Sequence, residues 1–223
     1  NYLPSDYQTF IATSRYARWL EEENRRENWG ETVERYTSNV VDPVAFNGSN
    51  SSNDTMNEIE QAILGLEVMP SMRSLMTAGP AADRDNTCMY NCAYLAVDNV
   101  LAFDEAMFIL LCGTGVGFSV ERQSVSKLPE VPSSFLPSES VIVVDDSKEG
   151  WAKALRKVIK TLYAGELPQW DVSKVRPAGA KLKTFGGRAS GPAPLIDLFN
   201  FVTKVFVNAA GRKLSSIECH DIM

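Results

Sequence analysis

The four cysteines are the residues of this 223-residue chain best suited to redox chemistry. Cys88 and Cys92 lie among polar residues, with three residues between them instead of the two of a typical redox pair or zinc knuckle. The chain has one histidine, so a complete zinc site is not expected and no metal ligands are predicted. We therefore expect at least one lone redox or reactive thiol among these cysteines. Cys112, in the apolar run Phe108–Cys112, is expected in the core.

A glycine-rich stretch, Val175–Leu195, is the second feature that could do chemistry, and it runs into an amphipathic helical pattern. Gly186, Gly187 and Gly191 permit backbone angles that would let consecutive amides turn towards an anion. Ser190 could cap the helix that follows, whose positive end favours phosphate. A tight connection without a ligand explains the same residues equally well, so both interpretations stay open.

Composition and charge narrow the class of protein. The chain is 44% hydrophobic and 22% charged, and its net charge is −6. This balance predicts a soluble globular protein that binds a small anion in preference to a nucleic acid. No apolar run approaches the roughly 18 residues that span a bilayer, and no signal-peptide pattern opens the chain, so a cytoplasmic protein without a membrane partner is expected.

The spacing of apolar residues predicts a helical region over residues 1–67. Helices are expected from Ser5 to Leu20 and from Glu31 to Val40, and a third begins at Asn53 or Asp54. The charged run Glu21–Glu27 is expected to be the solvated end of the first helix.

Beyond residue 67 strands are expected to alternate with helices, which predicts an α/β sheet or an incomplete barrel. Gly113–Gly117 lies between an expected helix and an expected strand, the opposite order to a dinucleotide-binding fingerprint, so a Rossmann fold is rejected. The expected strands are 92–97, 118–122, 140–144 and 214–223, and the expected helices are 103–112, 145–165 and 195–206.

Six sequence blocks carry a family resemblance: Met69–Leu75, Asn91–Cys92, Gly113–Val120, Asp146–Trp151, Arg176–Gly179 and Phe185–Leu195. They occur in the order found in class II ribonucleotide reductases. The closest resemblance is to the adenosylcobalamin-dependent ribonucleoside-triphosphate reductases, and it covers most of residues 69–223. It implies a helical N-terminal domain, residues 1–67, followed by the first part of a ten-stranded α/β barrel, residues 68–223.

The resemblance also implies a catalytic role for Cys92. By position it is similar to the first-strand cysteine of the family's redox pair, which becomes half of a disulfide as the ribose 2′-hydroxyl is lost. Two thiols supply the two electrons and two protons of that reduction. A buried small hydrophobe is the alternative for Cys92, and Cys88 is expected to be a bystander.

Other roles are carried over by position. For each of them, helix capping or an ordinary turn is a rival explanation. By resemblance, Ser71, Asn91, Ser190 and Gly191 bind substrate, Asp146, Ser147 and Lys148 bind the effector, and Asn208, Gly211 and Arg212 belong to the specificity loop.

The resemblance implies a ribonucleotide substrate, a deoxynucleotide effector, a thioredoxin-type reductant and adenosylcobalamin, bound mostly outside this chain. The family's radical cysteine, in an Asn-Pro-Cys-x-Glu context, is absent, and Cys219 does not match that motif. The chain alone is therefore expected to be an inactive N-terminal fragment. A nucleotide-binding regulatory module and a split-gene subunit completed by a separate C-terminal chain are the alternatives.

Overall fold

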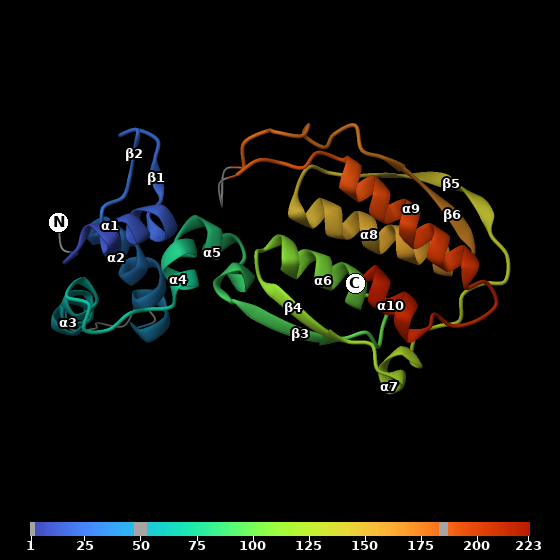
Figure 1. Cartoon of the computed structure of the whole chain (residues 1–223), viewed down its shortest axis with the longest axis horizontal. Coiled ribbons are helices and arrows are strands. Elements are labelled where there is room, and N and C mark those ends of the chain that lie inside the picture. The colour runs from blue at the N-terminus through green and yellow to red at the C-terminus, as the bar shows by residue number, and fades with distance from the viewer. Residues whose placement is uncertain (1–2, 47–52, 183–186) are drawn as a thin grey trace. The chain divides into compact units, whose positions relative to one another are not determined.

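The computed structural model describes all residues except 1–2, 47–52 and 183–186. It divides into two compact units, residues 1–91 and 92–223. Figure 1 labels their elements. The domain boundary expected after residue 67 stays a prediction, and residues 68–91 lie in the first unit.

The first unit is built from short helices and one small antiparallel ribbon (Figure 1). Ser5 caps the first helix, and Asn28 and Glu31 form a reciprocal capping box at the start of the second. In chain order the elements are α1 (Asp6–Ile11), η1 (Ala12–Tyr16), β1 (Trp19–Leu20), β2 (Arg25–Arg26), α2 (Trp29–Tyr36), η2 (Thr37–Phe46), α3 (Asn53–Leu64), α4 (Met72–Thr77), α5 (Pro80–Arg84) and η3 (Asn86–Met89).

The expected first helix is only partly correct. Helical structure ends at Tyr16, because Ala17 is extended, and the charged run that follows forms the β1–β2 ribbon. Asn24 turns that ribbon with a φ of 52°, a left-handed conformation that asparagine tolerates better than most residues. The expectation of a solvated helix end is therefore wrong, whereas α2 and α3 confirm the other two helices.

A buried ion pair ties this unit together. Arg35 Nε lies 2.8 Å from Glu27 Oε1, and the two side chains are only 12% and 6% exposed. The Arg35 guanidinium also donates to the carbonyl oxygens of Tyr16, Leu75 and Ala78. One side chain thus joins the ribbon, α2 and α4. The apolar residues packed in this unit are Ala12, Trp29, Val33, Ile63 and Leu75.

The second unit is built from two parallel strand pairs with helices between their strands (Figure 1). Parallel strands need a crossover, which α6 and α8 supply here. The elements are β3 (Cys92–Ala96), α6 (Ala102–Leu111), β4 (Gly115–Ser119), α7 (Arg122–Val125), β5 (Leu136–Val143), α8 (Lys148–Tyr163), β6 (Glu166–Asp171), α9 (Ala193–Asn208) and α10 (Ser216–Ile222).

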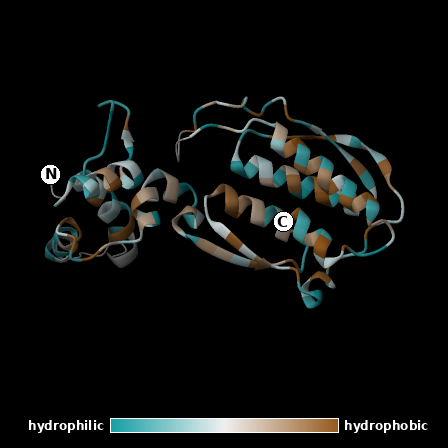
Figure 2. Ribbon diagram, in the orientation of Figure 1, coloured by the Kyte–Doolittle hydropathy of each residue, from teal (hydrophilic) through white to brown (hydrophobic). Residues whose placement is uncertain are grey.

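The core of this unit lies between its helices and strands. Along α8 and α9, Figure 2 shows hydrophobic and hydrophilic residues alternating as expected of amphipathic helices. The apolar face of α8 carries Leu155, Val158, Ile159 and Leu162, which are all buried. The helix begins after Ser147, which accepts a hydrogen bond from the Gly150 amide at 2.9 Å.

The α/β class is confirmed. The strands of the described residues form three two-stranded sheets. A ten-stranded barrel stays a prediction from resemblance. The expected final strand, 214–223, is wrong, because the Ser215–Glu218 capping box starts α10 there instead. Strand β6 was not expected, since Pro168 and polar neighbours conceal it in the sequence.

Acid should weaken the start of α10. The Arg212 guanidinium, and then the amide and hydroxyl of Ser215, hold the pKa of Glu218 at about 2, below its ordinary value of 4.5. A depressed carboxyl pKa contributes stability that is present above about pH 4.5 and is lost as the pH falls towards 2. We expect wild-type protein to lose more unfolding free energy across this interval than Glu218→Gln, as measured by urea denaturation. Equal losses in the two proteins would contradict the assignment.

Candidate functional site

Cys92 is the first residue of β3, and its side chain is exposed. The other three cysteines are buried. Tyr94, two residues along the same strand, is 71% exposed, so the thiol and the phenol share one face of the strand. In the parallel partner strand Gly115 and Gly117 lie opposite these two residues.

This pairing leaves the strand face beside the thiol open, because two of the four paired residues have no side chain. A thiol on such a face can be approached by a ligand or by a second thiol. Because Cys92 is exposed, the alternative interpretation of this residue as a buried small hydrophobe is wrong. The Gly-x-Gly spacing of Gly115 and Gly117 is the sequence signal that could have predicted this open face.

The other expected substrate residues fall in both units. Ser71 precedes α4, and its hydroxyl makes no capping hydrogen bond to that helix. Asn91 is the residue before Cys92 and ends the first unit. Ser190 and Gly191 belong to the second unit. Their grouping into one substrate site stays a prediction.

Within the glycine-rich stretch, residues 179–182 pair with residues 187–189 in an antiparallel arrangement. Lys181 and Arg188 are paired in an antiparallel bridge, and the amides of Gly179 and Ala189 donate across it at 2.9 and 2.8 Å. Those amides are therefore not directed at an anion. Residues 183–186, including Gly186, lie outside the described part of the chain.

Ser190 does not cap the next helix. Its hydroxyl donates to the Gly191 carbonyl at 3.2 Å, whereas Pro192 occupies the cap position of α9. The capping prediction is wrong because the helix begins two residues further along than it requires. Substrate binding by Ser190 is a separate prediction and stays one.

Gly191 is required at its position on two grounds. Its φ is +76°, and a Cβ there would lie 2.8 Å from the Ala178 nitrogen. We expect Gly191→Ala to lower the unfolding free energy by about 1–3 kcal/mol. Gly187 is the matched control, since its φ is +86° but a Cβ would meet nothing within 4 Å. Thermal denaturation should show the larger loss for Gly191→Ala, and equal losses would mean that the close contact with Ala178 is not costly.

The expected effector residues surround the start of α8. Asp146 accepts from Arg176 Nε at 2.7 Å, and Ser147 is the helix cap. Lys148 Nζ lies 3.1 Å from Cys112 Sγ and 5.0 Å from the centre of the Phe108 ring. The capping explanation for Ser147 is confirmed, and effector binding by all three residues stays a prediction.

The expected specificity loop is held by the rest of its unit. Gly211, at a φ of +75°, donates its amide to the Val131 carbonyl at 3.1 Å. Arg212 forms a two-pronged ion pair with Glu218, each hydrogen bond being 2.7 Å, and it also donates to the Asn208 carbonyl. Sequence reasoning missed Glu218, which the Ser-x-x-Glu spacing after residue 214 could have revealed.

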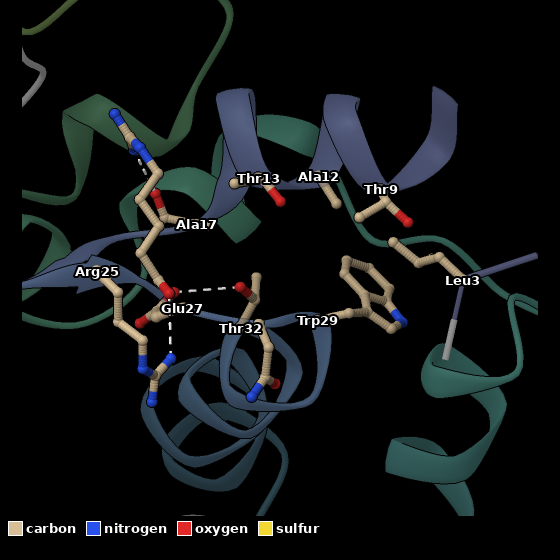
Figure 3. Close-up of a pocket in the computed structure, with 11 residues that line it drawn as sticks. Leu3, Thr9, Ala12, Thr13, Ala17, Arg25, Glu27, Trp29 and Thr32 are labelled. Atoms are coloured by element: carbon tan, nitrogen blue, oxygen red, sulfur yellow. Dashed lines mark hydrogen bonds between the residues drawn. The ribbon is translucent and has the colours of Figure 1, made fainter. Parts of the chain in front are cut away.

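A cavity of about 310 Å³ lies in the first unit. Figure 3 shows Trp29 and Leu3 at one side and Glu27, hydrogen-bonded to Thr32, at the other. The Glu27 carboxylate already accepts a hydrogen bond from Arg35, so a structural role explains why this charged side chain is buried. A second cavity, of about 280 Å³, lies between α6 and α8.

The described residues contain no cluster of three or more histidine, cysteine, aspartate or glutamate side chains suited to a metal ion. Within the same residues, no helix has the length and apolar character needed to cross a membrane.

Comparisons with known proteins agree with the resemblance. Residues 134–206 match the family model described as "B12-dependent ribonucleotide reductase, insertion domain". Adenosylcobalamin-dependent ribonucleoside-triphosphate reductases of Lactobacillus gasseri and Lactobacillus leichmannii are 27% and 30% identical to the chain. Each alignment covers 93% of this chain, but 37% and 36% of the respective relative.

A solved crystal structure of a B12-dependent, class II ribonucleotide reductase has the same fold. The TM-score is 0.83 at 28% sequence identity, and the match covers 96% of this chain and 38% of that one. The chain thus spans a little over a third of the length of the proteins it matches. Motif order, insertion-domain match and fold together confirm the resemblance recognised in the sequence: this chain is similar to the N-terminal part of class II ribonucleotide reductases.

Proposed function

We propose that this chain is the N-terminal part of a reductase that converts ribonucleoside triphosphates to 2′-deoxyribonucleotides, and that Cys92 is one of its two redox thiols. The observation that supports this role is the exposed Cys92 side chain on a strand face left open by Gly115 and Gly117. The named activity of the relatives supports the reaction class.

The chemistry assigned to this chain is limited to the thiol. Cys92 and a second thiol, supplied from outside this chain, give up two electrons and two protons and become a disulfide. The electrons replace the ribose 2′-hydroxyl, which leaves as water, with hydrogen. A thioredoxin-type reductant then restores both thiols. Thiyl-radical initiation of this step is part of the proposal, and so is the inactivity of the chain by itself.

Adenosylcobalamin does not fit the cavities of the described residues. Those cavities measure about 310 and 280 Å³, at or below the lower end of the ~300–1,000 Å³ range typical for drug-sized ligands, and a corrin with its nucleotide arm is far larger. No step is therefore assigned to the cofactor through this chain's residues. In the complete protein we place its binding site outside them.

The test is a thiol count on the complete reductase. Reduced enzyme, freed of external reductant, would be given substrate, effector and cofactor for a single turnover and then alkylated. We expect two fewer free thiols per active site, and peptide mapping should identify Cys92 as one of them. A turnover that leaves Cys92 alkylatable would contradict its redox role and favour a nucleotide-binding regulatory part.

A further inference from the structure

A lysine and a buried cysteine meet between α6 and α8. Cys112 is the C-cap residue of α6 and is 0% exposed. Lys148 is the first residue of α8, and its Nζ atom lies 3.1 Å from the Cys112 sulfur. The two residues are 36 positions apart in the sequence, so the packing of α6 against α8 creates the contact.

The lysine is held in this position from two sides. Its ammonium lies 5.0 Å from the centre of the Phe108 ring, which attracts a cation. Phe108 and Cys112 are one helical turn apart on α6, so both contact the same ammonium. The positive N-terminal end of α8 disfavours a cation there. The sulfur and the ring are two groups that offset this cost.

An amine beside a sulfur has a defined reaction when the sulfur is oxidised. Hydroperoxides convert a thiol to a sulfenic acid, and a sulfenic acid condenses with a nearby nitrogen. We propose that Cys112 and Lys148 form a reversible sulfur–nitrogen cross-link when the protein meets a hydroperoxide. The proposal does not depend on the reductase activity.

The cross-link forms in two balanced steps. The Cys112 sulfur, as a thiolate, attacks the peroxide and takes one oxygen atom, and the hydroxide that leaves takes a proton from the Lys148 ammonium. This gives the sulfenic acid, one water and a neutral amine. The neutral Lys148 amine then attacks this sulfur, the S–O bond breaks, and the hydroxyl leaves as a second water with one proton of the amine. Two thiol molecules reverse the change: they become a disulfide, and the free cysteine and lysine return.

Cys219 is a second buried cysteine, and its surroundings differ from those of Cys112 in a way that affects oxidation. Burial, and then the Glu218 carboxylate, raise the pKa of Cys219 to about 12, which opposes formation of the thiolate that attacks a peroxide. Cys112 is equally buried, but its sulfur is in contact with an ammonium, and Lys148 itself is only partly buried. Hydrogen peroxide is scarcely larger than water, and the proposal requires it to reach the sulfur beside this partly buried lysine.

The experiment is a peptide map of the complete protein that carries this chain. The protein is treated with hydrogen peroxide, alkylated and digested with trypsin. A modified Lys148 resists cleavage, so the cross-link should join residues 85–122 to residues 128–153. The joined peptide should be lighter than the sum of its parts by two hydrogen atoms. A thiol reductant added before alkylation should remove it.

Two variants and one control decide the outcome. Lys148→Arg keeps the positive charge and Cys112→Ser removes the sulfur, and each should lose the cross-link. Lys153→Arg, on the same helix, should keep it. Cys112 oxidised to a sulfinic acid beside an unmodified Lys148 would overturn the proposal. A joined peptide that is one oxygen atom heavier than the expected product would also overturn the proposal. Such a mass would mean that the bridge is not a simple sulfur–nitrogen bond. The wild-type map decides even where a variant does not fold.

Discussion

Cys92→Ser in the complete reductase is expected to reduce kcat by roughly 10³-fold or more, the scale seen when a catalytic nucleophile is removed. Serine has nearly the same shape as cysteine, but its hydroxyl cannot form the disulfide that the reduction of ribose requires. Cys92 is exposed, so the free energy of unfolding should change by less than about 0.5 kcal/mol. Deoxynucleotide formation per enzyme is the measurement.

Cys88→Ala is the control for this experiment. Cys88 lies four residues earlier in the chain, is 2% exposed, and is expected to be a bystander. Its loss should cost stability through a small cavity while kcat is retained. If Cys92→Ser turns over at the wild-type rate, the redox role is wrong. If both variants are folded but inactive, Cys88 is also needed for the reaction and is not a bystander.

Arg35→Met is expected to lower the free energy of unfolding of the first unit by about 3–5 kcal/mol. The substitution leaves the Glu27 carboxylate buried without its cation, at 6% exposure. It also removes the donors that the carbonyl groups of Tyr16, Leu75 and Ala78 accept from. Urea denaturation followed by circular dichroism is the measurement.

Arg25→Met serves as the matched control. Arg25 pairs with Glu31 in the same unit, but its side chain is 41% exposed, so its loss should cost less than about 1 kcal/mol. The double variant Arg35→Met with Glu27→Gln should recover part of the stability, because it removes the unpaired charge. A loss for Arg35→Met no larger than that for Arg25→Met would show that the pair does not hold the unit together.

Apolar spacing and capping residues in the sequence predicted the strands and helices that depend on neighbouring residues. The apolar pattern located β3 and therefore the strand that carries Cys92, and the stripe of α8 with its cap at Ser147 was visible in the sequence. The order of six motifs was sufficient to predict the similarity to class II ribonucleotide reductases that the comparisons confirm. These features depend on residues within a few positions of one another, or on blocks whose order survives divergence.

The features that were missed depend on distant partners. The β1–β2 ribbon is held by Glu27, whose partner Arg35 lies on α2, so a charged run that looked like a solvated helix end is anchored. Leu214–Met223 carries apolar residues that also suit a strand, but the Ser215–Glu218 box and Arg212 fix a helix there. The open face at Cys92 needed the register of β3 against β4, which no single stretch of sequence contains.

The two parallel strand pairs have a consequence for synthesis on the ribosome. Strand β3 cannot pair with β4 until α6 and β4 have both been synthesised, and β5 must likewise wait for α8 and β6. Each first strand therefore leaves the exit tunnel with its backbone groups unpaired and its apolar residues uncovered. Chaperones that bind nascent chains should meet this protein at those two moments, once as β3 emerges and again at β5.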